Sequence, residues 1–167
     1  MPANNWKGPL FGDQLWDVAG NWSLGVVPDS DSDVTIGKAG SYTVVIAATD
    51  PPFTVSGLTL KGAGNHTLTD HGVLSVDART TVLGNTLHVA ADGTANLTNV
   101  RLDSTATVID QGLVNIFGTF AGSGLTTPLI YQIGPKTSAK SGWSCSICEK
   151  RCISGRSLVS GMVGIRS

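Results

Sequence analysis

A sequence echo with a period close to twenty residues runs through the middle of this 167-residue chain. Residues 64–68 read Gly-Asn-His-Thr-Leu, and residues 84–87 read Gly-Asn-Thr-Leu, twenty positions further on. Three short polar turns that end in glycine recur at Gly72, Gly93 and Gly112, at spacings of 21 and 19 residues. A regular period of this size is typical of a solenoid built from stacked repeats.

Each repeat contains short runs in which apolar and polar residues alternate, as in Leu74-Ser75-Val76. Alternation indicates a strand, and so short a strand buries enough apolar surface only when neighbouring repeats cover it. We therefore predict an all-β fold, a short parallel β-helix with coils of about 20 residues and an N-terminal cap. A β-sandwich with evenly spaced hairpins is the alternative. The residues predicted to face the core are Leu58, Leu60, Leu74, Val76, Leu87, Val89, Leu97, Val108, Leu113, Val114 and Ile116.

The repeat pattern and the distribution of charged residues divide the chain into three segments. Residues 1–30 form the predicted cap, 31–131 the solenoid, and 132–167 a basic, cysteine-containing tail that lacks the repeat and is expected to be flexible. Residues 1–135 contain five Lys or Arg against eleven Asp, whereas the remainder contains six Lys or Arg and a single acidic residue, Glu149. The acidic body argues against a nucleic-acid-binding face. No apolar run is long enough to span a membrane.

A second motif precedes the repeats. Residues 16–36 read W-D-V-A-G-N-W-S-L-G-V-V-P-D-S-D-S-D-V-T-I, followed by alternating runs such as residues 42–46. With these runs, about residues 14–118 resemble the opening of bacterial autotransporter-passenger and haemagglutinin-like parallel β-helix surface proteins. The resemblance implies a β-helix located outside the cell or on a bacterial surface. Residues 1–5 do not have the pattern of a signal peptide, so we expect an exported protein to carry its signal elsewhere.

The three N-terminal tryptophans, Trp6, Trp16 and Trp22, have two interpretations. Large flat side chains can close the exposed end of a solenoid core, and we favour this interpretation because Trp16 and Trp22 lie just before the first repeat. Alternatively, the three rings form a ligand-binding platform for sugars.

Alternating aspartates at Asp29, Asp31 and Asp33 resemble the start of a calcium loop. The calcium-loop pattern then requires Gly at its sixth position and Glu at its twelfth, which are Val34 and Gly40 here. A solvated turn is therefore favoured over a calcium site, and no other cofactor is indicated.

A different set of aspartates, Asp70, Asp92 and Asp110, recurs near equivalent corners of the predicted coils. A row of carboxylates on one face could supply the acid and base of a polysaccharide-cleaving enzyme. The favoured interpretation is that these aspartates form Asx turns at the corners. The histidines at 66, 71 and 88 lack metal-ligand spacing and are expected at the surface.

All three cysteines lie in the tail, at Cys145, Cys148 and Cys152. Their spacing resembles part of a metal or cluster motif, but the fourth ligand is missing. A tail without a metal is therefore favoured.

Taken together, these patterns favour a non-catalytic structural or adhesive module of a bacterial surface or secreted protein. Its partners would be carbohydrate, another cell-surface ligand or its own copies. The alternative is a carbohydrate-active β-helix enzyme, a polysaccharide lyase or glycoside hydrolase, that uses the aspartate row.

Overall fold

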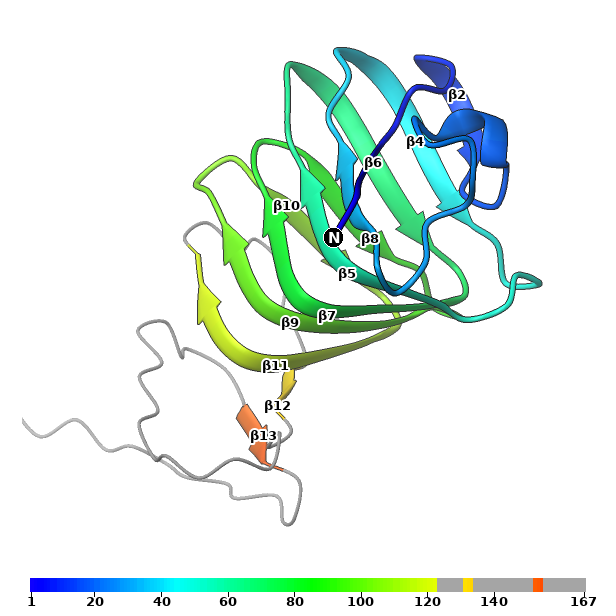
Figure 1. The fold of residues 1–167 in the computed structure, drawn as a ribbon. Coiled ribbons are helices and arrows are strands. Elements are labelled where there is room, and N and C mark those ends of the chain that lie inside the picture. Colours follow the sequence, from blue (N-terminus) through cyan, green and yellow to red (C-terminus); the bar gives the residue numbers. More distant parts are fainter. Residues whose placement is uncertain (123–130, 134–151, 155–167) are drawn as a thin grey trace, which may run out of the picture.

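The computed structural model describes residues 1–122, 131–133 and 152–154, which form a β-solenoid (Figure 1). Two parallel sheets make up its walls, one of eight strands in the order β1-β3-β5-β7-β9-β11-β12-β13 and one of five in the order β10-β8-β6-β4-β2. The eight-stranded sheet contains β1 (Ala3–Asn5), β3 (Asp33–Ile36), β5 (Phe53–Leu60), β7 (Val73–Val82), β9 (Thr94–Leu102), β11 (Leu113–Ala121), β12 (Tyr131–Ile133) and β13 (Cys152–Ser154). The five-stranded sheet contains β2 (Phe11–Leu15), β4 (Gly40–Ile46), β6 (Gly64–Asp70), β8 (Thr86–Val89) and β10 (Thr107–Asp110).

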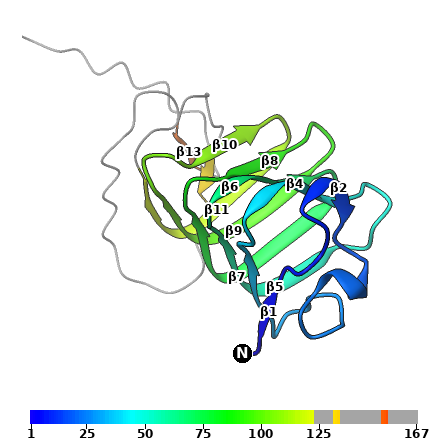
Figure 2. The same ribbon diagram turned by 90° about the horizontal axis from the view of Figure 1, so that it is seen from above.

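Successive coils place one strand in each sheet, so that equivalent residues of neighbouring coils stand side by side (Figure 2). Leu68 pairs with Leu87, and Leu87 pairs with Val108, in a single inward column. The parallel β-helix predicted from the repeat is confirmed. A β-sandwich of hairpins would have paired consecutive strands antiparallel, and every ladder between the described strands is parallel.

The repeated glycines mark corners at which one coil passes close to the next. A Cβ atom on Gly93 would collide with the carbonyl oxygen of Asp70 in the preceding coil, and one on Gly112 would collide with the carbonyl of Ala90. The backbone also bonds across this corner, where Thr94 N donates to Gly72 O at 2.8 Å. Glycine recurs here because only a residue without Cβ permits this approach.

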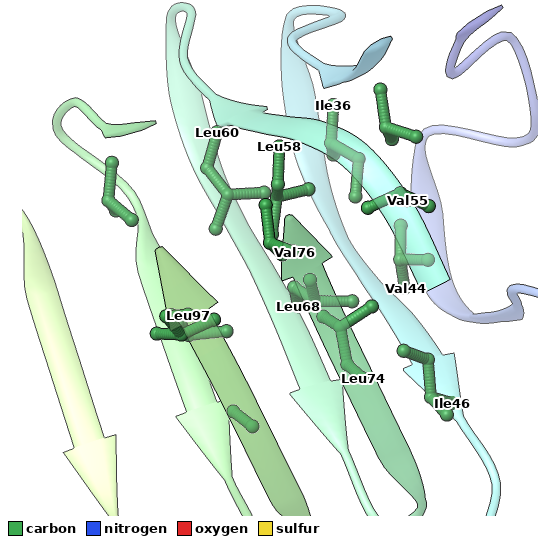
Figure 3. Packing of buried hydrophobic residues seen from close by; sticks show 14 of the residues in the cluster. Ile36, Val44, Ile46, Val55, Leu58, Leu60, Leu68, Leu74, Val76 and Leu97 are labelled. Carbon is green, nitrogen blue, oxygen red and sulfur yellow. The ribbon is translucent and has the colours of Figure 1, made fainter. Parts of the chain in front are cut away.

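The core lies between the two sheets and consists of inward Leu, Val and Ile side chains (Figure 3). Ten of the eleven predicted core residues are buried. The prediction was wrong for Leu113, which is 44% exposed, whereas its neighbour Val114 is 1% exposed. Adjacent strand residues face opposite sides of a sheet, and Leu113 pairs with Thr94 in an outward column.

The N-terminal cap closes one end of this core with aromatic rings. Trp22 packs edge-on against Trp6 and Trp16, with ring centroids 5.1 and 4.8 Å apart, and its Nε1 donates to Trp16 O at 2.7 Å. Trp6 in turn stacks on Tyr42 of β4. The 3-10 helix η1 (Ala19–Asn21) connects Trp16 to Trp22. Residues 1–30 thus contain cap elements together with β1 and β2, which already belong to the two sheets.

Most of the predicted tail lies outside the described residues. Within it, β12 pairs with β11, and β13 pairs with β12, in parallel registers. The expectation that residues 132–167 are flexible stays a prediction.

Candidate functional site on the outer face of the five-stranded sheet

The outer face of the five-stranded sheet carries a regular array of polar side chains. Thr43, Thr67, Thr86 and Thr107 pair in register across four neighbouring strands, and Asp13 of β2 continues the row. These threonines alternate along their strands with buried residues, so they point away from the core. Within such a row, the residues of neighbouring strands lie about 4.8 Å apart, so the side chains form a regular array across the face.

At its N-terminal end this face contains a shallow hollow. The hollow is lined mainly by polar groups, from Gly12, Ser41, Tyr42, Thr43, Asn65 and Thr67 of strands β2, β4 and β6. Hydroxyl and amide side chains of this kind can both donate and accept hydrogen bonds. Groups of this kind match the hydrogen-bonding groups of a polyhydroxylated molecule.

Phe11 places an exposed aromatic ring next to this hollow. It is 74% exposed, and it pairs in register with Ser41, one of the residues that line the hollow. Ser41 pairs in turn with Asn65, so ring, hydroxyl and amide form one row across three strands. An aromatic face beside hydrogen-bonding groups suits a ligand with both apolar and polar faces, as sugars have.

The same face also carries two titratable side chains, His88 and Asp13. His88 of β8 occupies an outward position next to Thr69, and its Nε2 lies 3.1 Å from Gln111 Oε1. Asp13 is the carboxylate at the N-terminal end of the threonine row, and it is exposed. The face therefore combines hydroxyls, one amide, one imidazole and one carboxylate, without a cationic Lys or Arg in its paired rows.

No protein-family model, curated protein or solved structure matches this chain. The function must therefore be argued from the site itself.

The tryptophans predicted as a binding platform lie elsewhere. Trp6, Trp16 and Trp22 are 3%, 0% and 0% exposed and pack against one another at the cap. Their rings are in the positions that the capping interpretation predicts, and no ring face is open to a sugar. Sequence reasoning missed Phe11 because it lies on an outward row of β2, a strand that precedes the repeats.

The aspartates of the predicted row do not line one face. Asp70 is fully buried, in an inward column where it pairs with Val89, and Val89 pairs with Asp110. Asp92 lies on the outside of the corner, where its Oδ1 is 2.9 Å from Nδ1 of His71. The carboxylates of Asp70 and Asp92 thus lie in different environments, because strand alternation turns one inward and the corner turns the other outward.

For Asp70 alone the Asx-turn interpretation is confirmed, since Gly72 N donates to Asp70 Oδ1 at 3.0 Å. The other carboxylate oxygen, Oδ2, is buried without a hydrogen-bond partner among the described residues. Burial raises the pKa of Asp70 to about 6, whereas the hydrogen bond from His71 lowers the pKa of Asp92. These are opposite shifts within one corner.

The candidate calcium loop is organised as a turn. Asp29 Oδ1 accepts hydrogen bonds from Asp31 N at 3.2 Å and from Ser32 Oγ at 2.8 Å. Asp33 instead points to Arg79 two coils along, with an Nη2–Oδ2 distance of 2.8 Å. Within the part of the chain that the structure describes, no cluster of three or more His, Cys, Asp or Glu could hold a metal.

Of the candidate cysteine ligands, Cys145 and Cys148 lie outside the described residues, and Cys152 begins β13.

The prediction that the histidines lie at the surface is wrong for His66, which is 1% exposed on an inward position of β6. The side chain of His71 is 41% exposed, as expected. Among the described residues no helix is long and apolar enough to cross a membrane.

Proposed function

We propose that this protein is a non-catalytic adhesive or structural module that binds carbohydrate through the outer face of its five-stranded sheet. The observation that carries the proposal is the 74% exposed ring of Phe11 beside the polar hollow. Burying an aromatic face against the apolar face of a sugar releases ordered water, while hydroxyls and amides at its rim satisfy the sugar hydroxyls.

The resemblance of residues 14–118 to bacterial surface β-helices supports the same setting, outside the cell or on its surface. The rigid, periodic sheet also suits a module that presents a face rather than one that closes around a substrate. Phosphate recognition is disfavoured on this face because its paired rows contain an Asp and no Lys or Arg.

One observation favours the enzymatic alternative. Asp70, with its pKa raised to about 6, lies near the His71–Asp92 pair, and perturbed carboxyl groups cluster at active sites. Asp70 is however fully buried, so a substrate cannot reach its carboxyl group without opening the corner. The adhesive function is therefore favoured.

The test is a glycan-binding screen run beside a polysaccharide-degradation panel. We expect binding without turnover, and we expect Phe11→Ala and Asn65→Ala to weaken binding at least several-fold. Leu24→Ala is the matched control, because Leu24 is 48% exposed but lies in the cap loop rather than on the sheet. Binding that survives Phe11→Ala unchanged contradicts the proposed site.

A second pair of variants addresses the enzymatic alternative. Asp92→Asn removes the exposed carboxylate of the corner, and the triple change of Asp70, Asp92 and Asp110 to Asn removes the predicted row. Neither variant should alter glycan binding if it folds. Turnover of a polysaccharide by the parent that disappears in Asp92→Asn would establish the enzyme instead.

A further inference from the structure

His66 is a buried histidine whose two ring nitrogens both face backbone carbonyl oxygens. Its Nδ1 lies 3.2 Å from Gly40 O, at the start of β4, and its Nε2 lies 3.1 Å from Lys61 O, in the turn after β5. The ring is on an inward position of β6 and is 1% exposed. The ring is therefore shielded from bulk water.

A neutral imidazole cannot satisfy this geometry. It carries one N–H, so one of its nitrogens would direct a lone pair at a carbonyl oxygen, which is itself only an acceptor. The imidazolium carries two N–H groups and donates to both carbonyls. Hydrogen bonds from a charged donor are also stronger than neutral ones.

The neighbouring Tyr42 ring favours the charged form independently. Tyr42 occupies the paired position on β4, and its ring stacks on that of His66 with centroids 4.7 Å apart and planes 24° apart. A cation over an aromatic face is stabilised by the negative potential of that face, most strongly where water is excluded. Desolvation acts in the opposite direction, against a buried charge.

Apart from the exposed, cationic side chain of Lys61, the other groups around the ring are neutral. Asn85, before β8, accepts a hydrogen bond from the His66 backbone N through its Oδ1 at 3.2 Å. Lys61 contributes its carbonyl and is an exposed residue. Across the core, the buried side chains of β3 and β5 are not titratable. Tyr42 is therefore the titratable side chain in contact with the ring, and it is neutral near pH 7 because burial raises its pKa further.

We propose that His66 is held in the folded protein as an imidazolium that clamps the start of β4 to the turn after β5. Its proton then couples the N-terminal end of the solenoid to pH. A group that is protonated more readily in the folded state contributes its full stabilisation below the titration of an unfolded histidine, about pH 6.5, and loses it as the pH rises.

The clamp also bears on the proposed glycan site, in a consequence that rests on the proposed function. Three residues that line the hollow are direct chain neighbours of this clamp: Ser41 follows Gly40, and Asn65 and Thr67 flank His66. Loss of the proton would loosen the floor of this hollow, so glycan affinity should fall as the pH rises above about 6.5. If no glycan binds at all, the proposed function fails while the clamp can still be established.

The direct test is NMR of the imidazole nitrogens in the full chain, labelled with nitrogen-15. Long-range proton–nitrogen correlation spectra distinguish an imidazolium from either neutral tautomer. We expect His66 to show two protonated nitrogens at about pH 7, above the titration of an ordinary histidine. A single neutral tautomer of His66 at that pH would overturn the proposal. The missing signals in His66→Gln provide the assignment.

Thermal unfolding gives a second measurement. As the pH rises above about 6.5, the parent should lose stability more steeply than His66→Gln does, whereas His88→Gln, on the neighbouring strand, should retain the parental slope. An unchanged slope in His66→Gln would also contradict the clamp. If His66→Gln does not fold, the NMR measurement on the parent decides the matter.

Discussion

Asn115 Nδ2 donates to Asn96 Oδ1 across 2.8 Å, joining residues that hold the same position in successive coils. Asn96 Nδ2 in turn lies 3.1 Å from Ser75 Oγ in the coil before. The three polar side chains form a short ladder on the outer face of the eight-stranded sheet.

Removing the middle of this ladder should be costly. We expect Asn96→Ala to lower the free energy of unfolding by about 1–2 kcal/mol, because it removes two side-chain hydrogen bonds. Chemical denaturation measures the change. Asn65→Ala, at an exposed position of the other sheet, is the control and should change stability by less than about 0.5 kcal/mol. Equal effects of the two variants would show that the ladder does not contribute.

Truncating Leu74 should destabilise the core. Leu74 is fully buried, and Leu74→Ala is expected to cost about 2–5 kcal/mol because a packed coil collapses poorly around a cavity. Leu113→Ala is the matched control: Leu113 starts the strand β11 but is 44% exposed, so its truncation should have a small effect. A similar midpoint of denaturation for both variants would show that the inward and outward faces are misassigned.

Asp70 should make the protein more stable in mild acid. Because burial raises its pKa to about 6 in the folded protein, the protonated carboxyl group is favoured there relative to the unfolded chain. Its contribution is fully present below about pH 4 and is lost as the pH rises to about 6. A shift of this size corresponds to roughly 3 kcal/mol.

Asp70→Asn removes this titration. The difference in unfolding free energy between parent and variant should therefore change by roughly 3 kcal/mol from pH 4 to pH 7, in the direction of a relatively more stable variant at pH 7. Asp92→Asn removes the exposed carboxylate of the same corner. Because the pKa of Asp92 is lowered, this variant should not become relatively more stable than the parent between pH 4 and pH 7. A constant difference between the parent and Asp70→Asn across this range would mean that the carboxyl group titrates normally.

Thr80→Val should stabilise the fold. Thr80 is fully buried, and its hydroxyl has no hydrogen-bond partner among the described residues. It borders apolar side chains that include Val100 and Phe120. Valine has nearly the same shape and removes an unsatisfied polar group, a change worth about 1–3 kcal/mol. Thr81→Val, on the outward side of β7, is the control. A lower melting temperature for Thr80→Val would show that the hydroxyl is satisfied.

The sequence by itself determined the class of fold and most of the core. Gly72, Gly93 and Gly112 mark one corner in each coil, and the alternating runs between them specify which residues face inward, because the side-chain period of a strand is two. Leu113 was misassigned because it precedes another apolar residue, Val114, and the local pattern does not say which of the two is inward. The register with Thr94 and Ala95 decides that.

Only the tertiary structure decided where the chemically distinctive groups lie. Phe11 is exposed because it faces outward in register with Ser41, and His66 is buried because its strand turns it inward beside Tyr42. Asp70 and Asp92 are separated by the corner between them, although both belong to similar polar turns. Local sequence gives the spacing of such residues along the chain. Their burial and partners depend on the coils above and below, which only the packed solenoid brings into contact.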